Sequence, residues 1–265
     1  MDPYGEPFYQ ALSHDPVRLS QVERAERYAI RLLPFIPRGL PVFQSHGIGH
    51  SRAIIRHLNC IFTIPGLSPS TEETALLYMA AWFHDLGYLH PESVHNRGTH
   101  ADLSGDMIRR DPVIRDLVVQ SERQALDTVV RCHDSRADLT RISNYGSDHR
   151  VSLMAALFRL ADAADIGTDR CPPEVFALIE DGLDEHSRRH WLAHQNVLGC
   201  RVAYPFIRIL VHDLQNPFFS RMILPHLEED CRSTGMILQR YGFSQFSIVC
   251  RRNKAETVQI ASSLP

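Results

Sequence analysis

Apolar residues at helical spacing dominate the chain up to about residue 165. Residues 75–83 carry only apolar or aromatic side chains, which predicts a helix that is buried on all sides. Elsewhere, apolar residues recur every three or four positions, as they do on one face of an α-helix. The pattern predicts helices over residues 20–33, 47–60, 71–85, 98–110, 112–119, 122–133 and 148–165, and a shorter helix that begins at Pro172–Glu174.

Two of these helices have clear start signals. Ser70 followed by Glu73 is typical of a capping box, in which each side chain bonds to the backbone of the other residue. Asp111 before Pro112 combines a capping residue with a proline in the first helical turn. Residues 1–20 contain three prolines, and we expect them to form an irregular arm.

The pattern changes after residue 195. Residues 197–212 are rich in Val, Ile, Tyr and Phe and predict a strand, or a hairpin with the residues before them. Residues 218–240 predict a helix, residues 242–250 alternate like a second strand, and the polar residues after 251 are expected to fray. We therefore expect a mainly α protein, with an N-terminal arm and helix over residues 1–40, a helical domain over 41–195 and a small α+β segment over 196–265.

Six ionisable residues fall on the apolar faces of five successive predicted helices. His84, for example, follows Leu77 and Ala80 by seven and four positions, so its ring shares their inward face. Burying such groups costs several kcal/mol, in the range of about 2–7, unless they are paired or bound to a cation. The residues are His50, His84, Asp85, His100, His133 and Asp162.

A single residue of this set could instead be a core His or Asp that is satisfied by one neighbouring hydrogen bond. The His-Asp dipeptide is not diagnostic either, because it also occurs at 14–15, 133–134 and 212–213. What distinguishes His84-Asp85 is its place at the end of a buried helix. The alternative does not account for six such residues together, so we interpret them as one metal site.

The motifs around these residues resemble those of the HD superfamily of metal-dependent phosphohydrolases. The similarity extends over about residues 43–170 and is closest to the HD-CE branch, through the Ser-His-Gly-Ile-Gly-His phrase and through Leu-Ala-Asp-Ala-Ala-Asp-Ile followed by Arg170. The matching segments are Ser45–Ser51, Trp82–Gly87, Arg97–Ala101, Val129–His133 and Phe158–Asp162.

The resemblance implies an HD-domain helical bundle that holds divalent metal. In the simplest members four ligands, here His50, His84, Asp85 and Asp162, surround one ion. Members with two additional histidines, here His100 and His133, hold two ions bridged by the Asp of the pair, here Asp85. Imidazole and carboxylate ligands do not distinguish Mn, Fe, Co, Ni, Mg or Zn.

The function that the resemblance implies is hydrolysis of a phosphoester or phosphodiester bond in a nucleotide-type substrate by a metal-activated hydroxide. Two alternatives stay open. The same ligand order is similar to that of HD-type oxygenases, which use mixed-valent di-iron centres. A sensor that binds a nucleotide without turning it over is the other alternative, although such a module has no need of all six ligands.

Residues beside the ligands are candidates for supporting roles. His46, one helical turn before His50, could donate a proton to a leaving group, contact the substrate or make a local hydrogen bond. Arg52 and Arg97 could bind phosphate or lie in solvent. Asp165 could orient a ligand histidine, and Arg170 could pair with Asp165 or reach the substrate.

Another histidine series has a simpler interpretation. His186, His190 and His194 are spaced four apart, and we expect them to form a solvated face around Trp191. No acidic residue follows them in the manner of a zinc protease motif.

Composition limits the partners. The net charge of −3 argues against broad nucleic-acid binding, and we expect a small-molecule nucleotide or phosphoester as the partner, with self-association left open. The six cysteines are widely separated and lack a CxxC motif, which favours free thiols. No signal peptide or membrane-length apolar run is recognised, so we expect a cytoplasmic protein with no membrane partner.

Overall fold

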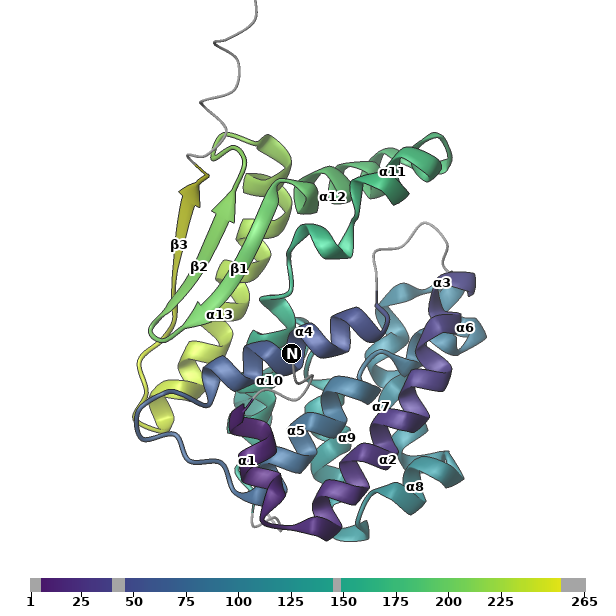
Figure 1. Cartoon of the computed structure of the whole chain (residues 1–265), viewed down its shortest axis with the longest axis vertical. Helices are drawn as coiled ribbons and strands as arrows, with labels where there is room; N and C mark the ends of the chain where they lie inside the picture. The colour runs from purple at the N-terminus through teal and green to yellow at the C-terminus, as the bar shows by residue number, and fades with distance from the viewer. Residues whose placement is uncertain (1–5, 40–45, 145–148, 254–265) are drawn as a thin grey trace, which may run out of the picture.

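A computed structural model describes residues 6–39, 46–144 and 149–253; within these ranges the side chains of residues 6–9, 38, 39 and 97 are not described. The described chain forms a helical body beside a small sheet, with helix α13 lying along the sheet (Figure 1). The fold is thus mainly α with a small C-terminal α+β part, as the sequence predicts.

The predicted helices of the body are present in their predicted order, together with helices over residues 6–13, 36–39, 91–95 and 185–195 that the sequence pattern did not predict. They are α1 (Glu6–Ser13), α2 (Pro16–Leu32), α3 (Ile36–Gly39), α4 (Ile48–Ile61), α5 (Thr71–Phe83), α6 (Pro91–His95), α7 (His100–Arg110), α8 (Pro112–Leu117), α9 (Arg123–Arg131), α10 (Val151–Ala163), α11 (Pro173–Ile179) and α12 (Glu185–Gln195). The C-terminal part consists of β1 (Val197–Ala203), β2 (Phe206–Val211), the π-helical turn η8 (Phe219–Ile223), α13 (Leu224–Arg240) and β3 (Ser247–Arg252). Short 3-10 turns connect several of the helices, among them η2 (Leu86–Leu89), η3 (Arg97–Thr99) and η6 (Thr168–Arg170).

Helices α5 and α10 form the centre of the core. All residues from Ala75 to Phe83 are buried, and α5 packs against α2, α4 and α9. The capping box of Ser70 and Glu73 is present as predicted, and Glu73 also accepts hydrogen bonds from the backbone and side chain of Arg150, the N-cap residue of α10. One carboxylate therefore fixes the starts of both central helices.

The predicted irregular arm over residues 1–20 is wrong where the structure describes it. Glu6–Ser13 and Pro16–Leu32 are helical, and Asp15 caps α2 by accepting from the backbone N–H groups of Val17 and Arg18. Pro7 and Pro16 lie in the first turns of their helices, where a missing N–H costs no intrahelical bond. Prolines there start helices rather than prevent them.

The strand prediction over residues 197–212 is corrected in one respect. The hairpin forms within this segment, between β1 and β2, and not with the residues before it, because the chain reverses at Tyr204–Pro205. Strand β3 then pairs parallel to β2 after a crossover through α13. Ile207, Ile209 and Val211 alternate with exposed residues and face the core.

Several helices are shorter than predicted, and the difference lies at the predicted ligands. Helix α5 ends at Phe83, so that His84 is its C-cap and Asp85 follows the helix. Helix α9 ends at Arg131, two residues before His133. The helix ends, rather than the helix interiors, carry much of the site. Among the described residues, no helix is both long enough and apolar enough to cross a membrane.

Candidate metal centre

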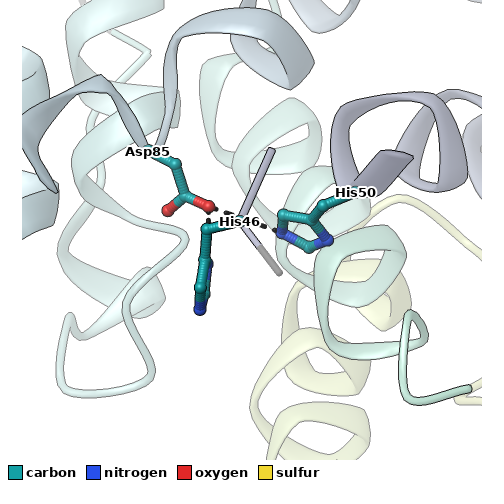
Figure 2. Close-up of side chains that lie close together, drawn as sticks. All are labelled: His46, His50 and Asp85. Atoms are coloured by element: carbon teal, nitrogen blue, oxygen red, sulfur yellow. Dashed lines mark hydrogen bonds and ion pairs between the residues drawn. The ribbon is translucent and has the colours of Figure 1, made fainter. Parts of the chain in front are cut away.

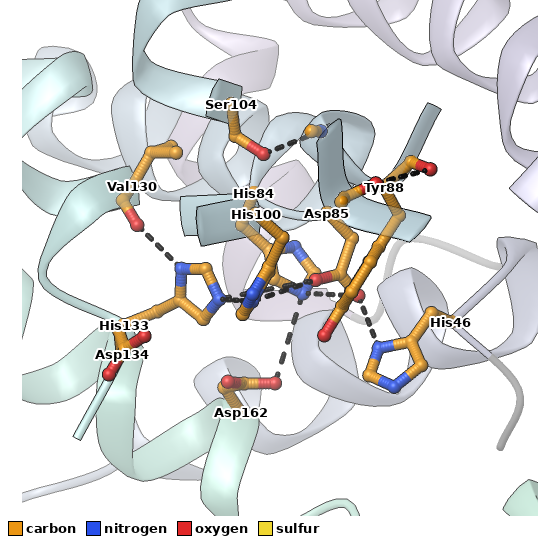
Figure 3. Close-up of polar contacts among 12 residues, drawn as sticks. His46, His84, Asp85, Tyr88, His100, Ser104, Val130, His133, Asp134 and Asp162 are labelled. Carbon is orange, nitrogen blue, oxygen red and sulfur yellow. Dashed lines mark hydrogen bonds and ion pairs between the residues drawn. The ribbon is translucent and has the colours of Figure 1, made fainter. Parts of the chain in front are cut away.

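The six predicted ligands converge between α4, α5, α7, α9 and α10, and Figure 3 labels all of them except His50. His50 lies in the first turn of α4, His100 begins α7 and Asp162 lies in the last turn of α10. The residues come from positions up to 112 apart in the sequence, from 50 to 162, and their ligand atoms fall into overlapping groups no wider than 4.8 Å.

One group contains His50, His84 and Asp162. The Nε2 atom of His50 lies 3.0 Å from Asp162 Oδ1 and 3.2 Å from His84 Nε2. Asp85 Oδ2 lies 3.1 Å from His84 Nε2 and 3.6 Å from His50 Nε2, so it closes the group from the opposite side.

A second group contains His100 and His133. Their Nε2 atoms lie 2.8 Å apart, and they are 3.7 Å and 4.0 Å from Asp85 Oδ1. The two oxygen atoms of the Asp85 carboxylate therefore face different histidine pairs. Each group could hold a metal ion.

Hydrogen bonds at the outer nitrogen atoms of two predicted ligands define which ring nitrogen carries the proton. His50 Nδ1 lies 2.7 Å from Asp165 Oδ2, and His133 Nδ1 lies 2.5 Å from the carbonyl oxygen of Val130. Both contacts place a proton on Nδ1, because the partner oxygen atoms only accept. The Nε2 lone pairs then point inward, which is the tautomer that a metal ligand needs.

These donors fit a divalent cation. Nitrogen lone pairs at 2.8–3.2 Å repel one another, and carboxylates at this distance add negative charge, unless a cation lies between them. Nitrogen and carboxylate oxygen donors suit divalent ions of the first transition series and, with more oxygen, Mg²⁺. No cysteine takes part, unlike in structural zinc sites.

The carboxylates make this point favourable for positive charge. Burial and Arg170 favour the neutral ring of His50, but the hydrogen bonds with Asp162 and Asp165 outweigh them and raise the pKa of His50 to about 9. Burial opposes ionisation of Asp85 too, yet the neighbouring rings of His84 and His46 hold its pKa well below the ordinary value. The carboxylates that favour a proton on His50 would favour a bound metal cation at this point for the same electrostatic reason.

The pKa of His133 shifts in the opposite direction. Burial is the main cause, followed by repulsion from His84 and His100, and together they lower the pKa of His133 to about 4. Its ring is neutral at pH 7, as a metal ligand must be. The guanidinium of Arg159 donates to the carbonyl oxygens of Cys132, Asp134 and Ala137 and thereby fixes the turn that carries His133.

His46 and Arg170 form a chain of contacts to Asp85. His46 Nδ1 lies 2.7 Å from Asp85 Oδ2, the same oxygen atom that lies 3.6 Å from His50 Nε2, and these three residues form a further group that could hold a metal ion (Figure 2). Arg170 Nη2 lies 3.0 Å from His46 Nε2 and Arg170 Nη1 lies 3.3 Å from the backbone oxygen of Asp165. Because Arg170 can only donate, Nε2 of His46 accepts and its Nδ1 donates to Asp85. Burial lowers the pKa of His46 to about 3, so the ring is neutral at pH 7.

One predicted supporting residue is not brought to this point, and the side chain of another is not described. Arg52 is exposed on α4 and is not among the residues that line the cavity. The side chain of Arg97 lies outside the described part of the chain. Asp165, His46 and Arg170, in contrast, all line the cavity above the ligands.

Several contacts of the site are not indicated by the sequence pattern. The ring of Tyr88 stacks on His100 at 4.2 Å, and Ser104 Oγ accepts from the backbone N–H of Gly87 at 2.7 Å. A Cβ atom at Gly87 would lie 2.0 Å from the backbone oxygen of His100, so the turn after Asp85 has room only for glycine. The only sequence signal for this close approach is Gly87 itself, the last residue of the His84-Asp85-Leu86-Gly87 segment.

The expectation of a solvated histidine face on α12 holds for His186 but is wrong for His190 and His194. His186 is exposed, but His190 and His194 line the cavity, and His194 is buried with Nδ1 2.9 Å from the carbonyl oxygen of Ile166. Trp191 is buried on the same helix. The spacing of four residues thus places the rings of His190 and His194 on the cavity wall, where the sequence pattern alone favoured solvent.

Comparison with known protein families agrees with this geometry. A family model described as HD-CE matches residues 27–212. The chain belongs to the HD-CE family. No curated protein and no solved structure matches the chain.

The HD-CE match contains all six predicted ligands, together with His46, Asp165 and Arg170. It confirms the family that the motifs of the sequence resemble. The matched region ends at residue 212, after β2 and before α13. The HD-CE domain and its His and Asp clusters fit a metal-dependent hydrolase.

Proposed function

We propose that this HD-CE protein is a divalent-metal-dependent phosphohydrolase that cleaves a phosphoester or phosphodiester bond of a nucleotide-type substrate. The observation that carries the proposal is the position of Asp85. Its Oδ2 faces His50 and His84 while its Oδ1 faces His100 and His133. A carboxylate between two histidine pairs is suited to hold two cations side by side, which favours a catalytic centre over a structural one.

Each ligand has a defined position in this proposal. His50, His84, Asp85 and Asp162 would hold one ion, and Asp85, His100 and His133 would hold the other. Divalent cations bound there would polarise a phosphoryl oxygen and lower the pKa of a water molecule.

The residues around the ligands orient the donor set and keep protons where they are needed. Asp165 keeps the proton of His50 on Nδ1, and the carbonyl oxygen of Val130 does the same for His133. His46 donates to Asp85 and so fixes the direction of the carboxylate that both groups share. Arg170 places positive charge at the cavity wall beside His46, where it favours an anionic substrate.

The space above the ligands supports a small substrate. The cavity has a volume of about 340 Å³, which lies within the range of sites for small molecules. It is partly open to solvent and is lined by five of the six predicted ligands, all but His84, and by residues of α12 and α13. A mononucleotide, or one end of a longer phosphodiester, is of suitable size.

A phosphate-release screen with each divalent ion tests the proposal. Nucleotides, cyclic dinucleotides and short oligonucleotides serve as substrates for the purified chain. We expect turnover of at least one compound, and a loss of at least 100-fold in D85N. The exposed His186 provides a matched control, since H186A should retain the full rate.

Two results would redirect the assignment. Iron in the purified protein, with oxygen consumption and no phosphate release, would favour the di-iron oxygenase that the ligand order also resembles. Nucleotide binding without turnover under any ion would favour a sensor. Either result would contradict phosphohydrolysis.

A further inference from the structure

The cavity above the ligands has a second wall that the HD-CE ligands do not explain. It is formed by His190 and His194 of α12 and by η8 and α13. Met222, His226 and Asp230 are spaced four residues apart, and so are Ile223 and Leu227, so one face of the helix lines the cavity. The residues of η8 and α13 lie beyond the family match, which ends at residue 212.

This wall begins in an irregular turn. Residues Phe219–Ile223 form a π-helical turn immediately before α13. Such turns are rare and frequently lie at functional sites, because the wider turn changes the direction of the side chains that follow. Here it precedes the face that carries His226 and Asp230.

The carboxyl group of Asp230 lies on this wall, and its hydrogen bonding is incomplete. The residue is 8% exposed, and its Oδ1 has no hydrogen-bond partner in the part of the chain that the structure describes. The positive charge of Arg159 lowers the pKa of Asp230, but the Arg159 guanidinium donates its hydrogen bonds to three backbone carbonyl oxygens. Burial is the main cause that raises the pKa of Asp230 to about 7. A buried polar atom without a partner destabilises a protein, so its presence in a cavity points to a ligand that completes it.

The groups beside Asp230 indicate what that ligand is. Met222, Ile223 and Leu227 present apolar surface, and His226 adds an imidazole ring. Burial lowers the pKa of His190 to about 4, so this ring is neutral at pH 7. Apolar side chains and neutral rings pack against a flat heterocycle, while a carboxyl oxygen binds N–H groups at its edge.

We propose that this wall is the base-binding half of a nucleotide site, with Asp230 Oδ1 accepting a hydrogen bond from an N–H group of the base. The inference rests on the proposed function for the class of ligand. The phosphate end would lie toward Arg170 and the metal ligands, and the base would lie against α13. Asp230 is then a residue that determines specificity, and it takes no part in bond cleavage.

Pairs of nucleotides that differ in one N–H donor test this assignment. Adenosine monophosphate and purine riboside monophosphate differ in the 6-amino group, and guanosine and inosine monophosphates differ in the 2-amino group. Calorimetric affinities are measured with the full chain and added Mn²⁺, for the wild type, for D230L, which has no acceptor, and for the control D116L. Asp116 has a 75% exposed side chain that pairs with Arg24, and it is not among the cavity residues.

We expect loss of the donor to weaken binding about 10-fold or more in the wild type and in D116L for at least one pair, and less than 2-fold for that pair in D230L. Equal affinity within both pairs for the wild type overturns the inference, and so does an equal loss in D230L. Absence of nucleotide binding overturns it as well. The wild-type comparison decides the matter even if D230L does not fold.

The affinities, taken together with the phosphate-release screen, separate this inference from the hydrolase proposal. Donor-dependent binding without phosphate release under any ion supports the base site and contradicts hydrolysis. Phosphate release from nucleotides with no dependence on the donor in affinity supports hydrolysis and contradicts the base site.

Discussion

Asp165 Oδ2 lies 2.7 Å from Nδ1 of His50, so the carboxylate three residues after one predicted ligand orients the ring of another. The contact holds the proton of His50 on the outer nitrogen and leaves Nε2 to face Asp162. Partners of this kind commonly change metal affinity by 10–100-fold when they are removed.

Replacement of Asp165 by asparagine tests the role of its contact with His50. D165N should weaken divalent metal binding about 10-fold or more, because an amide is a poorer acceptor and can turn its NH₂ group toward the ring. Titration of the purified chain with Mn²⁺, followed by calorimetry, measures the change. D169N is the matched control, since Asp169 is exposed four residues further on, and its affinity should equal that of the wild type. Equal affinity of D165N and the wild type would contradict the orienting role.

The sequence was sufficient to predict most helices and the convergence of six His and Asp side chains, because apolar spacing and the position of His84-Asp85 after a buried helix depend on local order. It was insufficient for contacts between distant segments. Nothing in the order of residues indicates that Asp230 or His194 would reach the cavity, since their approach depends on how α12 and α13 pack on the body. An irregular arm does not form over residues 6–20, because Pro7 and Pro16 lie in the first turns of helices, where proline is tolerated.

Arg170 should act through His46. Its donation to His46 Nε2 fixes the tautomer in which Nδ1 donates to Asp85. R170M removes this donor, and we expect kcat to fall about 10- to 100-fold with the metal content retained, because Asp85 loses its fixed orientation. Elemental analysis and steady-state rates with the substrate found in the screen measure both quantities. R52M is the control, because Arg52 is exposed and outside the cavity, and an equal loss in the two variants would contradict the argument.

Gly87 should tolerate no side chain. An added Cβ atom would lie 2.0 Å from the backbone oxygen of His100 and 2.7 Å from the backbone nitrogen of Ser104, and backbone atoms cannot turn away. We expect G87A to lower the free energy of unfolding by about 2–3 kcal/mol and to displace His100.

Gly49 provides the matched control. A Cβ atom there meets nothing within 4 Å, and the residue lies in the first turn of α4. G49A should leave the free energy of unfolding unchanged or raise it by up to about 1 kcal/mol. Urea denaturation of both variants measures the difference, and equal stabilities would show that the approach of Gly87 to α7 is not constraining.

Buried histidines should make the protein less stable in mild acid. Burial, with a contribution from Arg170, lowers the pKa of His194 to about 3 in the folded chain, whereas an unfolded His titrates near 6.5. Between about pH 6.5 and pH 3 the unfolded chain therefore binds a proton that the folded chain does not, and stability falls as the pH falls. The full effect is about 1.4 kcal/mol per pH unit for each such residue.

H194N removes this group and keeps an N–H donor for the carbonyl oxygen of Ile166. Its free energy of unfolding should change less steeply than that of the wild type between pH 6 and about pH 4. H186N, which alters an exposed residue on the same helix, should follow the wild type. Identical pH slopes for H194N and the wild type would contradict a neutral, buried His194.

The number of divalent ions bound per chain tests the central claim most directly. If Asp85 joins two groups of ligands, the wild type should bind about two ions, H133A should retain about one, and D85N should bind fewer than one. Elemental analysis after dialysis against Mn²⁺ gives these ratios. Absence of bound metal in the wild type, or the same ratio in H133A as in the wild type, would contradict a centre built around Asp85.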